Sequence, residues 1–413
     1  MRTVKLFSAL ALVTCWMSSA PAHAESQDDD IGTRPAAPRK AEVAVGPLTQ
    51  DESGQGTAQG DVTPVVARPD SEYNSGGGGP RDMGGSGSSL DEPTDWAVLH
   101  AGLRPHLGTF GGVAAMALAH ERIERFYGGF SLSLIRNDAG THVGALQLAI
   151  GRNLADEFIG VSQFSLAENR ARTFMGVGQV ALAYNRSLDW YGALQFAGVN
   201  RAQEFYGGLQ IGGYNRTEEE FFGLAQIGGF NLAEEDFVGL GQLGFYNQAE
   251  DFTGLFQVGF LNAQGEIYDE HIDGKDGSFA GLVQAGAANS TGRFRGVLQA
   301  GVTNFSADFV GGFQVGLAAY SKEFRGVAQI GGGNITEKLY GSQIGVANIS
   351  EEVHGVQIGL FNHTERLRGL QIGLVNHASD GVLEWSPIIN MGFGDDDGYA
   401  YEAKRRASQT ARF

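Results

Sequence analysis

The sequence predicts an all-β protein built as a β-solenoid, and three observations support that prediction. A short motif, G-x-(x)-Q-x-G-x-x-N, recurs at 17 positions between Ser131 and Trp385. The spacing of its Gln position shortens from 16 residues to 15 and then to 14. Within each copy, side chains alternate with a period of two, which is typical of a β-strand. A fixed period predicts stacked units that bury their faces against their neighbours.

An antiparallel outer-membrane β-barrel of about 16–18 strands is the alternative that fits the same strands. A barrel closes only if its strand register is sheared in one sense, and identical hairpins would cancel that shear. Barrels of this kind also alternate short turns with long loops, whereas the spacing here has no such rhythm. We therefore favour a solenoid of about 17 coils of 14–16 residues.

The N-terminus reads as a secretory signal over residues 1–24. Arg2 and Lys5 precede an apolar run, and Ala22-His23-Ala24 offers a cleavage site. The run is too short for a spanning helix, and no other segment is long and apolar enough to predict one. Cys15 is the only cysteine in the chain and lies inside this signal, so no disulfide is expected. It faintly resembles a lipoprotein anchoring site, but Thr14 is a poor residue before such a cysteine.

Residues 25–95 form a linker that is rich in Gly, Pro, Ser and Asp, and we expect it to be disordered because it has too few apolar residues to fold. A capping segment over residues 96–124 follows, and the repeat domain covers residues 125–393. The formal net charge of −18 argues against nucleic acid as a partner, since phosphates require clusters of Lys and Arg.

In the repeat around Gln357, the side chains of Val356, Ile358 and Leu360 share one face of the strand. We expect these aliphatic residues to face the interior together with the aromatic residue that precedes each Gln, so that Ile358→Asp costs several kcal/mol. The Asn that ends each motif is expected in a turn, where Asn tolerates left-handed backbone. Acidic stretches such as residues 217–220 follow it.

Stacking of the coils would align like residues into structural ladders, in which each Gln amide donates to the next. The expected ladder residues are Gln226, Gln242, Gln257, Gln284, Gln299, Gln314, Gln329, Gln343, Gln357 and Gln371, with Asn231, Asn247, Asn262, Asn348, Asn362 and Asn376. His363 and His377 follow the Asn of consecutive coils and would also stack, and we interpret them as ordinary turn residues, not metal ligands.

One insertion breaks the array. The step from Gln257 to Gln284 is 27 residues, and the extra residues, 266–277, include five acidic side chains. Asp269, Asp273 and Asp276 are candidate calcium ligands, because their acidic oxygens lie near a Gly in the sequence. The segment lacks the spacing of an EF-hand, so a solvated loop is favoured. Residues 394–413 form a C-terminal tail.

The units at residues 355–362 and 369–376, GVQIGLFN and GLQIGLVN, resemble the bacterial surface-repeat proteins first described in Leptospira and found in other Gram-negative bacteria. The resemblance covers about residues 125–393, and residues 385–390, WSPIIN, are similar to the closing repeat of that family. The first copies depart from the pattern, since Ser131 replaces Gln. The resemblance implies an exported protein at the cell surface or outer membrane, and it brings no catalytic residues.

The sequence thus predicts a non-catalytic repeat protein that serves as a rigid spacer or an extended binding surface. An outer-membrane pore is the alternative, and a polysaccharide-processing β-helix enzyme is a third, disfavoured class, because these strands carry almost no charged residues. No cofactor is expected. A surface polysaccharide or another envelope protein are the partners considered, and membrane association fits as well. The expected location is the Gram-negative cell surface, outer membrane or periplasm.

Overall fold

The computed structural model describes residues 94–265 and 277–393, of which 85% lie in strands and none in a helix. The strands are β1 (Thr94–Trp96), β2 (Leu99–Gly102), β3 (His106–Ala117), β4 (His120–Ser133), β5 (Arg136–Ala149), β6 (Arg152–Ser165), β7 (Glu168–Met175), β8 (Gly178–Ala181), β9 (Tyr184–Thr217), β10 (Phe221–Phe222), β11 (Ala225–Val238), β12 (Gly241–Thr253), β13 (Phe256–Val258), β14 (Leu261–Gln264), β15 (Ser278–Ala280), β16 (Val283–Ala285), β17 (Ala288–Ala300), β18 (Thr303–Ala378) and β19 (Trp385–Phe393).

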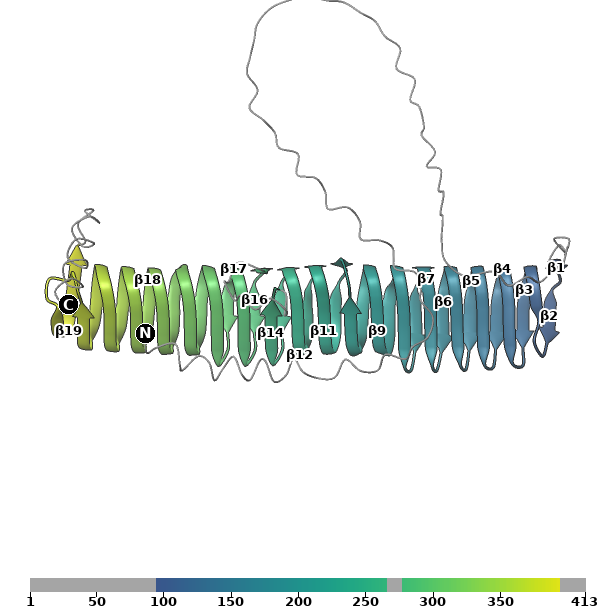
Figure 1. Cartoon of the computed structure of the whole chain (residues 1–413), viewed down its shortest axis with the longest axis horizontal. Helices are drawn as coiled ribbons and strands as arrows, with labels where there is room; N and C mark the ends of the chain where they lie inside the picture. Colours follow the sequence, from purple (N-terminus) through teal and green to yellow (C-terminus); the bar gives the residue numbers. More distant parts are fainter. Residues whose placement is uncertain (1–93, 266–276, 394–413) are drawn as a thin grey trace, which may run out of the picture. The chain divides into compact units, whose positions relative to one another are not determined.

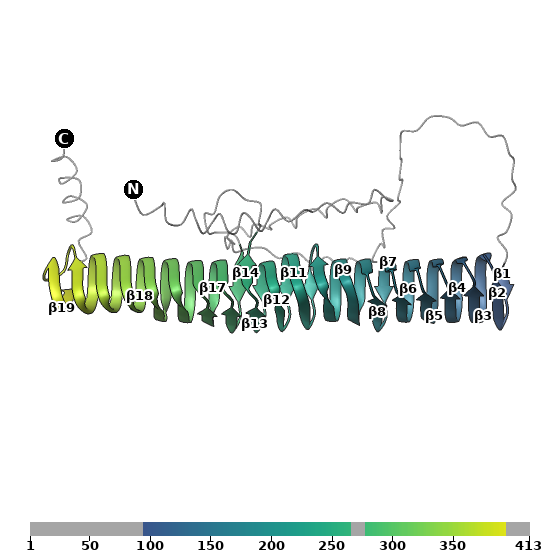
Figure 2. The ribbon, with the colours of Figure 1, turned by 90° about the horizontal axis from the view of Figure 1, so that it is seen from below.

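Successive repeats pair in parallel, each residue lying opposite its equivalent one period further along the chain. Gln147 of β5 lies opposite Gln163 of β6, and Gln226 of β11 opposite Gln242 of β12. The coils stack in a single row in both views of the ribbon (Figures 1 and 2). This register confirms the β-solenoid and is not that of an antiparallel barrel. The strand β18 runs through several coils without a break.

The array begins and ends at other residues than predicted. Ala115 of β3 lies opposite Ser131 of β4, so a parallel coil already lies within the segment expected only to cap the array. At the other end β19 is antiparallel to β18, with Gln371 opposite Asn390. Trp385 therefore starts no further coil, and its assignment to the repeat series was wrong. The strand β1 also begins two residues inside the predicted linker.

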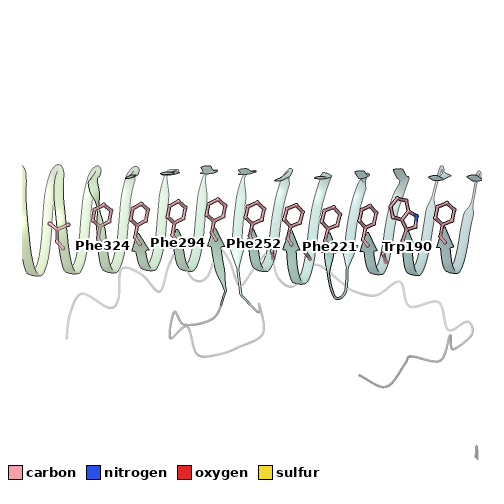
Figure 3. Close-up of a cluster of buried hydrophobic side chains, with 14 of the residues drawn as sticks. Trp190, Phe221, Phe252, Phe294 and Phe324 are labelled. Carbon is pink, nitrogen blue, oxygen red and sulfur yellow. The ribbon is translucent and has the colours of Figure 1, made fainter. Parts of the chain in front are cut away.

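A stack of aromatic rings fills one side of the interior (Figure 3). It runs from Phe110 to Phe324, with one ring from each coil, and neighbouring rings such as Phe237 and Phe252 lie nearly parallel with centroids 4.9 Å apart. The spacing matches the distance of about 4.8 Å between paired strands. Phe237 and Phe252 are completely buried. The predicted interior aromatic ladder is confirmed, and full burial of one Phe contributes about 1.5–3 kcal/mol.

Aliphatic residues replace the rings in the last coils, where the repeat shortens to 14 residues. Leu339, Val353 and Leu367 hold the buried position there, one residue closer to the Gln than in longer coils. The glycine that follows two residues later compensates for the missing residue: Gly355 has φ +147°, in the region that glycine favours, and an added Cβ would lie 1.9 Å from the carbonyl oxygen of Gly341.

The motif strand points its Gln face inward and its aliphatic face outward, which is the reverse of the prediction. Gln357 is completely buried, whereas Ile358 is 39% and Leu360 55% exposed. The interior accepts the amide because neighbouring coils satisfy it, so that Ile358→Asp would place a carboxylate in water at little cost. The Asn residues are also buried and lie within strands, not in left-handed turns: among the described residues Ile388 is the only non-glycine residue with positive φ.

The insertion leaves the array intact on either side. Residues 266–276 lie outside the described residues, and the coils before and after them pair directly. Asn262 of β14 lies opposite Asn289 of β17, and Phe252 of β12 opposite Phe279 of β15. The extra residues are therefore accommodated between β14 and β15, between the buried Asn and the buried aromatic residue of one coil.

Candidate functional site

The Gln residues form one continuous hydrogen-bonded ladder inside the solenoid. From Gln163 to Gln371, each Nε2 donates to the Oε1 of the Gln in the preceding coil, over 2.6–3.2 Å. All of these side chains are completely buried. An unpaired buried amide is costly, and a paired one is not. The ladder spans the insertion, because Gln284 donates to Gln257 at 3.0 Å.

The Asn residues form a second ladder that donates in the opposite direction. Asn348 Nδ2 donates to Asn362 Oδ1 of the following coil at 2.8 Å, and also to the carbonyl oxygen of Ile358 at 3.0 Å. A glycine makes room for this amide: a Cβ at Gly359 would lie 2.7 Å from Asn348 Nδ2. Because the two ladders point opposite ways, their amide dipoles partly cancel along the solenoid axis.

The Asn ladder has a gap at Ala319, which stands where other coils have Asn. Asn304 lies one coil before it and Asn334 one coil after it. Asn334 Oδ1 is buried without a hydrogen-bond partner among the described residues, and Asn153 Oδ1, at the start of the ladder, is likewise unpartnered. Each orphaned oxygen thus marks a place where no preceding Asn donates.

The first coils hold two buried ionisable groups in place of the repeat residues. Glu121 takes the Asn position and is completely buried; Ser131, which replaces Gln, donates its hydroxyl to Glu121 Oε2 at 3.1 Å. Burial raises the pKa of Glu121 to about 7, which the bond from Ser131 partly opposes. His142 takes an aromatic position between Phe126 and Phe158, and burial lowers its pKa to about 3.

An exposed apolar surface runs along the outside of the ladder strand. We define the apolar face by the Gln position of each coil, which Ala115 and Ser131 occupy in the first two of these coils. The face comprises the seven residues from two before to four after each such position, from residues 113–119 to residues 369–375. None of these segments contains Asp, Glu, Lys, Arg or His. Its most exposed side chains, all more than 40% exposed, include Val161, Val177, Leu224, Leu240, Leu255, Val297, Val327, Leu134, Leu166, Leu182, Phe245, Phe260, Val302, Leu317, Val346, Leu360 and Leu374.

A shallow hollow with a volume of about 700 Å³ lies on the apolar face. It arises because Ala285 and Ala300 stand directly after the Gln, where other coils carry larger residues such as Leu243. Its lining is Ala285, Gly286, Ala300, Gly301, Val302, Val315, Gly316, Leu317, Ile330, Gly331 and Gly332. Beside it, Phe245 and Phe260 stack with centroids 5.0 Å apart and are each about half exposed.

Charged side chains lie on the rest of each coil, between the buried Asn and the next buried aromatic residue. Many of these side chains interact with the next coil along the solenoid axis. Arg216 forms a salt bridge with Glu234 of the next coil at 2.7 Å, and Gln203 donates a hydrogen bond to Glu219 at 2.6 Å. Burial raises the pKa of Asp236, and the neighbouring carboxylates of Asp251 and Glu220 raise it further. This part of the surface is acidic.

The predicted calcium ligands Asp269, Asp273 and Asp276 lie outside the described residues. His363 and His377 do stack, with ring centroids 4.7 Å apart. Within residues 94–265 and 277–393, no group of three or more His, Cys, Asp or Glu side chains could hold a metal ion. In the same part of the chain, no helix is long and apolar enough to cross a membrane.

Comparison with known proteins identified no relatives. No family model matches the chain, and neither the curated proteins nor the solved structures gave a match.

Filling the gap in the Asn ladder should stabilise the protein. Ala319→Asn would accept from Asn304 and donate to the orphaned oxygen of Asn334, and we expect a gain of about 1 kcal/mol in the free energy of unfolding, measured by urea titration. Ala318→Asn is the matched control, since Ala318 is exposed, and it should change stability by less than about 0.5 kcal/mol. A loss of stability in Ala319→Asn would contradict the account of the ladder.

Glu121 should make stability depend on pH. Its folded pKa of about 7 exceeds the unfolded value of 4.5, so its contribution is fully present below pH 4.5 and is lost as the pH rises through 7. Between these limits the wild type should lose about 3 kcal/mol relative to Glu121→Gln. Urea unfolding of both proteins at pH 4.5, 6 and 8 measures the difference. Parallel pH profiles of the two proteins would show that folding does not raise the pKa of Glu121.

Proposed function

We propose that this protein is an exported, non-catalytic repeat protein of a Gram-negative cell surface or outer membrane, whose solenoid presents an extended binding surface. The observation that carries the proposal is the apolar face, which continues without a charged residue through every coil from residues 113–119 to 369–375. Soluble monomers rarely expose a continuous apolar surface of this extent, and such surfaces usually mark interaction sites.

The chemistry of the face indicates how it would bind. Its exposed groups are aliphatic and aromatic side chains, such as Leu360, Leu374 and Phe260. These groups bind by removing apolar area from water, and they offer nothing to a phosphate or a metal ion. We therefore propose an apolar protein surface of the cell envelope as the partner class, with no cofactor.

Two further features fit this function. The signal predicted over residues 1–24 would export the chain, and the resemblance of residues 125–393 to the surface-repeat proteins points to the same compartment. A role as a rigid spacer is compatible with the binding role, because the Gln ladder joins each coil to its neighbours from Gln147 to Gln371. Bending such an array would break buried amide hydrogen bonds.

Cell fractionation tests the proposal. In the source bacterium, the wild-type protein should be found in the envelope fraction and be digested when protease is added to intact cells. Leu317→Glu combined with Leu360→Glu should leave the amount of protein unchanged but reduce its envelope retention at least tenfold, whereas Glu351→Lys, on the charged part of a coil, should not. A protein that stays in the cytoplasm, or whose retention ignores both changes, would refute the proposed function.

A further inference from the structure

The apolar face is too large to remain in water. Coils stacked at about 4.8 Å give it a length of about 75 Å, and about six strand residues give it a width of about 20 Å. Its area of about 1,500 Å² exceeds the largest apolar patch of a typical monomer, which is about 300–600 Å². Something therefore covers much of it.

Charge favours a second copy of this chain over a lipid surface. Helices and sheets that bind lipid combine apolar residues with flanking Lys and Arg, whereas this chain has 47 acidic against 29 basic residues. Two copies that meet through the apolar face desolvate no charge, because the face contains none. Their acidic segments stay in water.

The repeat itself also favours a second copy. Side-chain rows on the face, such as those of Leu240 and Leu255 or of Leu360 and Leu374, recur once per coil. Another copy has the same spacing by construction, so its rows can stay opposite these rows along the full length of contact. Packed sheets of this kind lie about 10 Å apart and interdigitate their side chains.

A projection and a hollow lie next to each other on the face. Phe245 and Phe260 project from the two coils before the coil of Gln284, and the hollow occupies the coil of Gln284 and the three coils after it. A two-fold axis across the solenoid near Gln284 would set Phe260 of each copy over Val302 of the other, and Phe245 over Leu317; both Val302 and Leu317 line the hollow. The axis keeps each row opposite its own row, which a side-by-side parallel arrangement would not.

We propose that two copies associate face to face and antiparallel about this axis, with Phe245 and Phe260 of each copy in the hollow of the other. The inference rests on the proposed function, since it names the partner of the same binding surface. The overlapping coils would bury about 2,300 Å² in total, above the 1,200–2,000 Å² of standard interfaces. The coil of Leu134 lies beyond the overlap and stays uncovered.

Sedimentation equilibrium on the purified mature chain, at about 1–50 μM, tests the dimer. The wild type should have twice the mass of one chain. Phe245→Glu with Phe260→Glu should be monomeric, and Ala300→Glu, which changes the hollow from the other side, should be monomeric as well. Leu134→Glu, on the same face outside the overlap, should remain dimeric. Circular dichroism establishes that each variant keeps its strand content, and Ala300→Glu decides the question if the Phe variant does not fold.

Cross-linking tests the axis. The mature chain contains no cysteine of its own, so a short bismaleimide should join two copies of Ala287→Cys, which lies at the axis, and should not join copies of Leu134→Cys. The proposal fails if the wild type is monomeric, if Leu134→Glu separates the copies, or if Leu134→Cys cross-links instead. A monomer that floats with phosphatidylethanolamine vesicles would assign the face to lipid. A monomer whose envelope retention still depends on Leu317 and Leu360 would leave the proposed function standing.

Discussion

The structure depends on one constraint: a buried side-chain amide must find a partner in the coil before it and in the coil after it. Each Gln in the middle of the array donates to one neighbour and accepts from the other, as Gln343, Gln357 and Gln371 illustrate. A shift of register by one residue would remove both bonds and turn an aliphatic residue inward. The ladder therefore fixes which residues lie opposite each other, and the aromatic stack supplies apolar burial at the same spacing.

This constraint explains where variation is tolerated. Coil length changes between 16 and 14 residues at positions outside the two ladders, and the 12 extra residues, 266–277, lie between a buried Asn and a buried Phe. Where a ladder residue is lost, the consequence is local. Ala319 leaves an unpaired oxygen on Asn334, and Ser131 is accompanied by a buried carboxyl group on Glu121 that reaches across to its hydroxyl.

Much of the fold could be predicted from the sequence. The period predicted stacked coils, and the uniform spacing favoured parallel stacking; the aromatic position predicted a buried stack, and like residues lie opposite one another as expected. Hydrophobicity could not predict which face of the motif strand points inward, because Val356, Ile358 and Leu360 look like the inward face. The inward face is decided cooperatively: Gln357 is acceptable inside only when the coils on both sides present Gln as well. The apolar face was missed for the same reason, although the absence of charge around every Gln was a visible signal.

The ends of the array were also misjudged, for a different reason. An early coil contains Ala115 in place of Gln, and Glu121 in place of Asn, so the motif fails there while the backbone pairing continues. At the other end Trp385 falls at the expected spacing, but residues 379–384 turn the chain back, and β19 pairs antiparallel to β18. The period of a sequence predicts which residues occupy equivalent positions, but it does not predict whether the next strand runs parallel or antiparallel to the last one.

The most direct test of the account compares Gln357→Leu with Ile358→Asp by urea unfolding. Both changes are best made in the background of Phe245→Glu with Phe260→Glu, so that association of copies does not contribute. The buried ladder predicts that Gln357→Leu costs about 2 kcal/mol or more, because it leaves an N–H of Gln371 without its acceptor. Ile358→Asp, at a 39% exposed position, should cost less than about 1 kcal/mol. The opposite order, with Ile358→Asp the more damaging change, would show that the aliphatic residues face inward and would contradict the account.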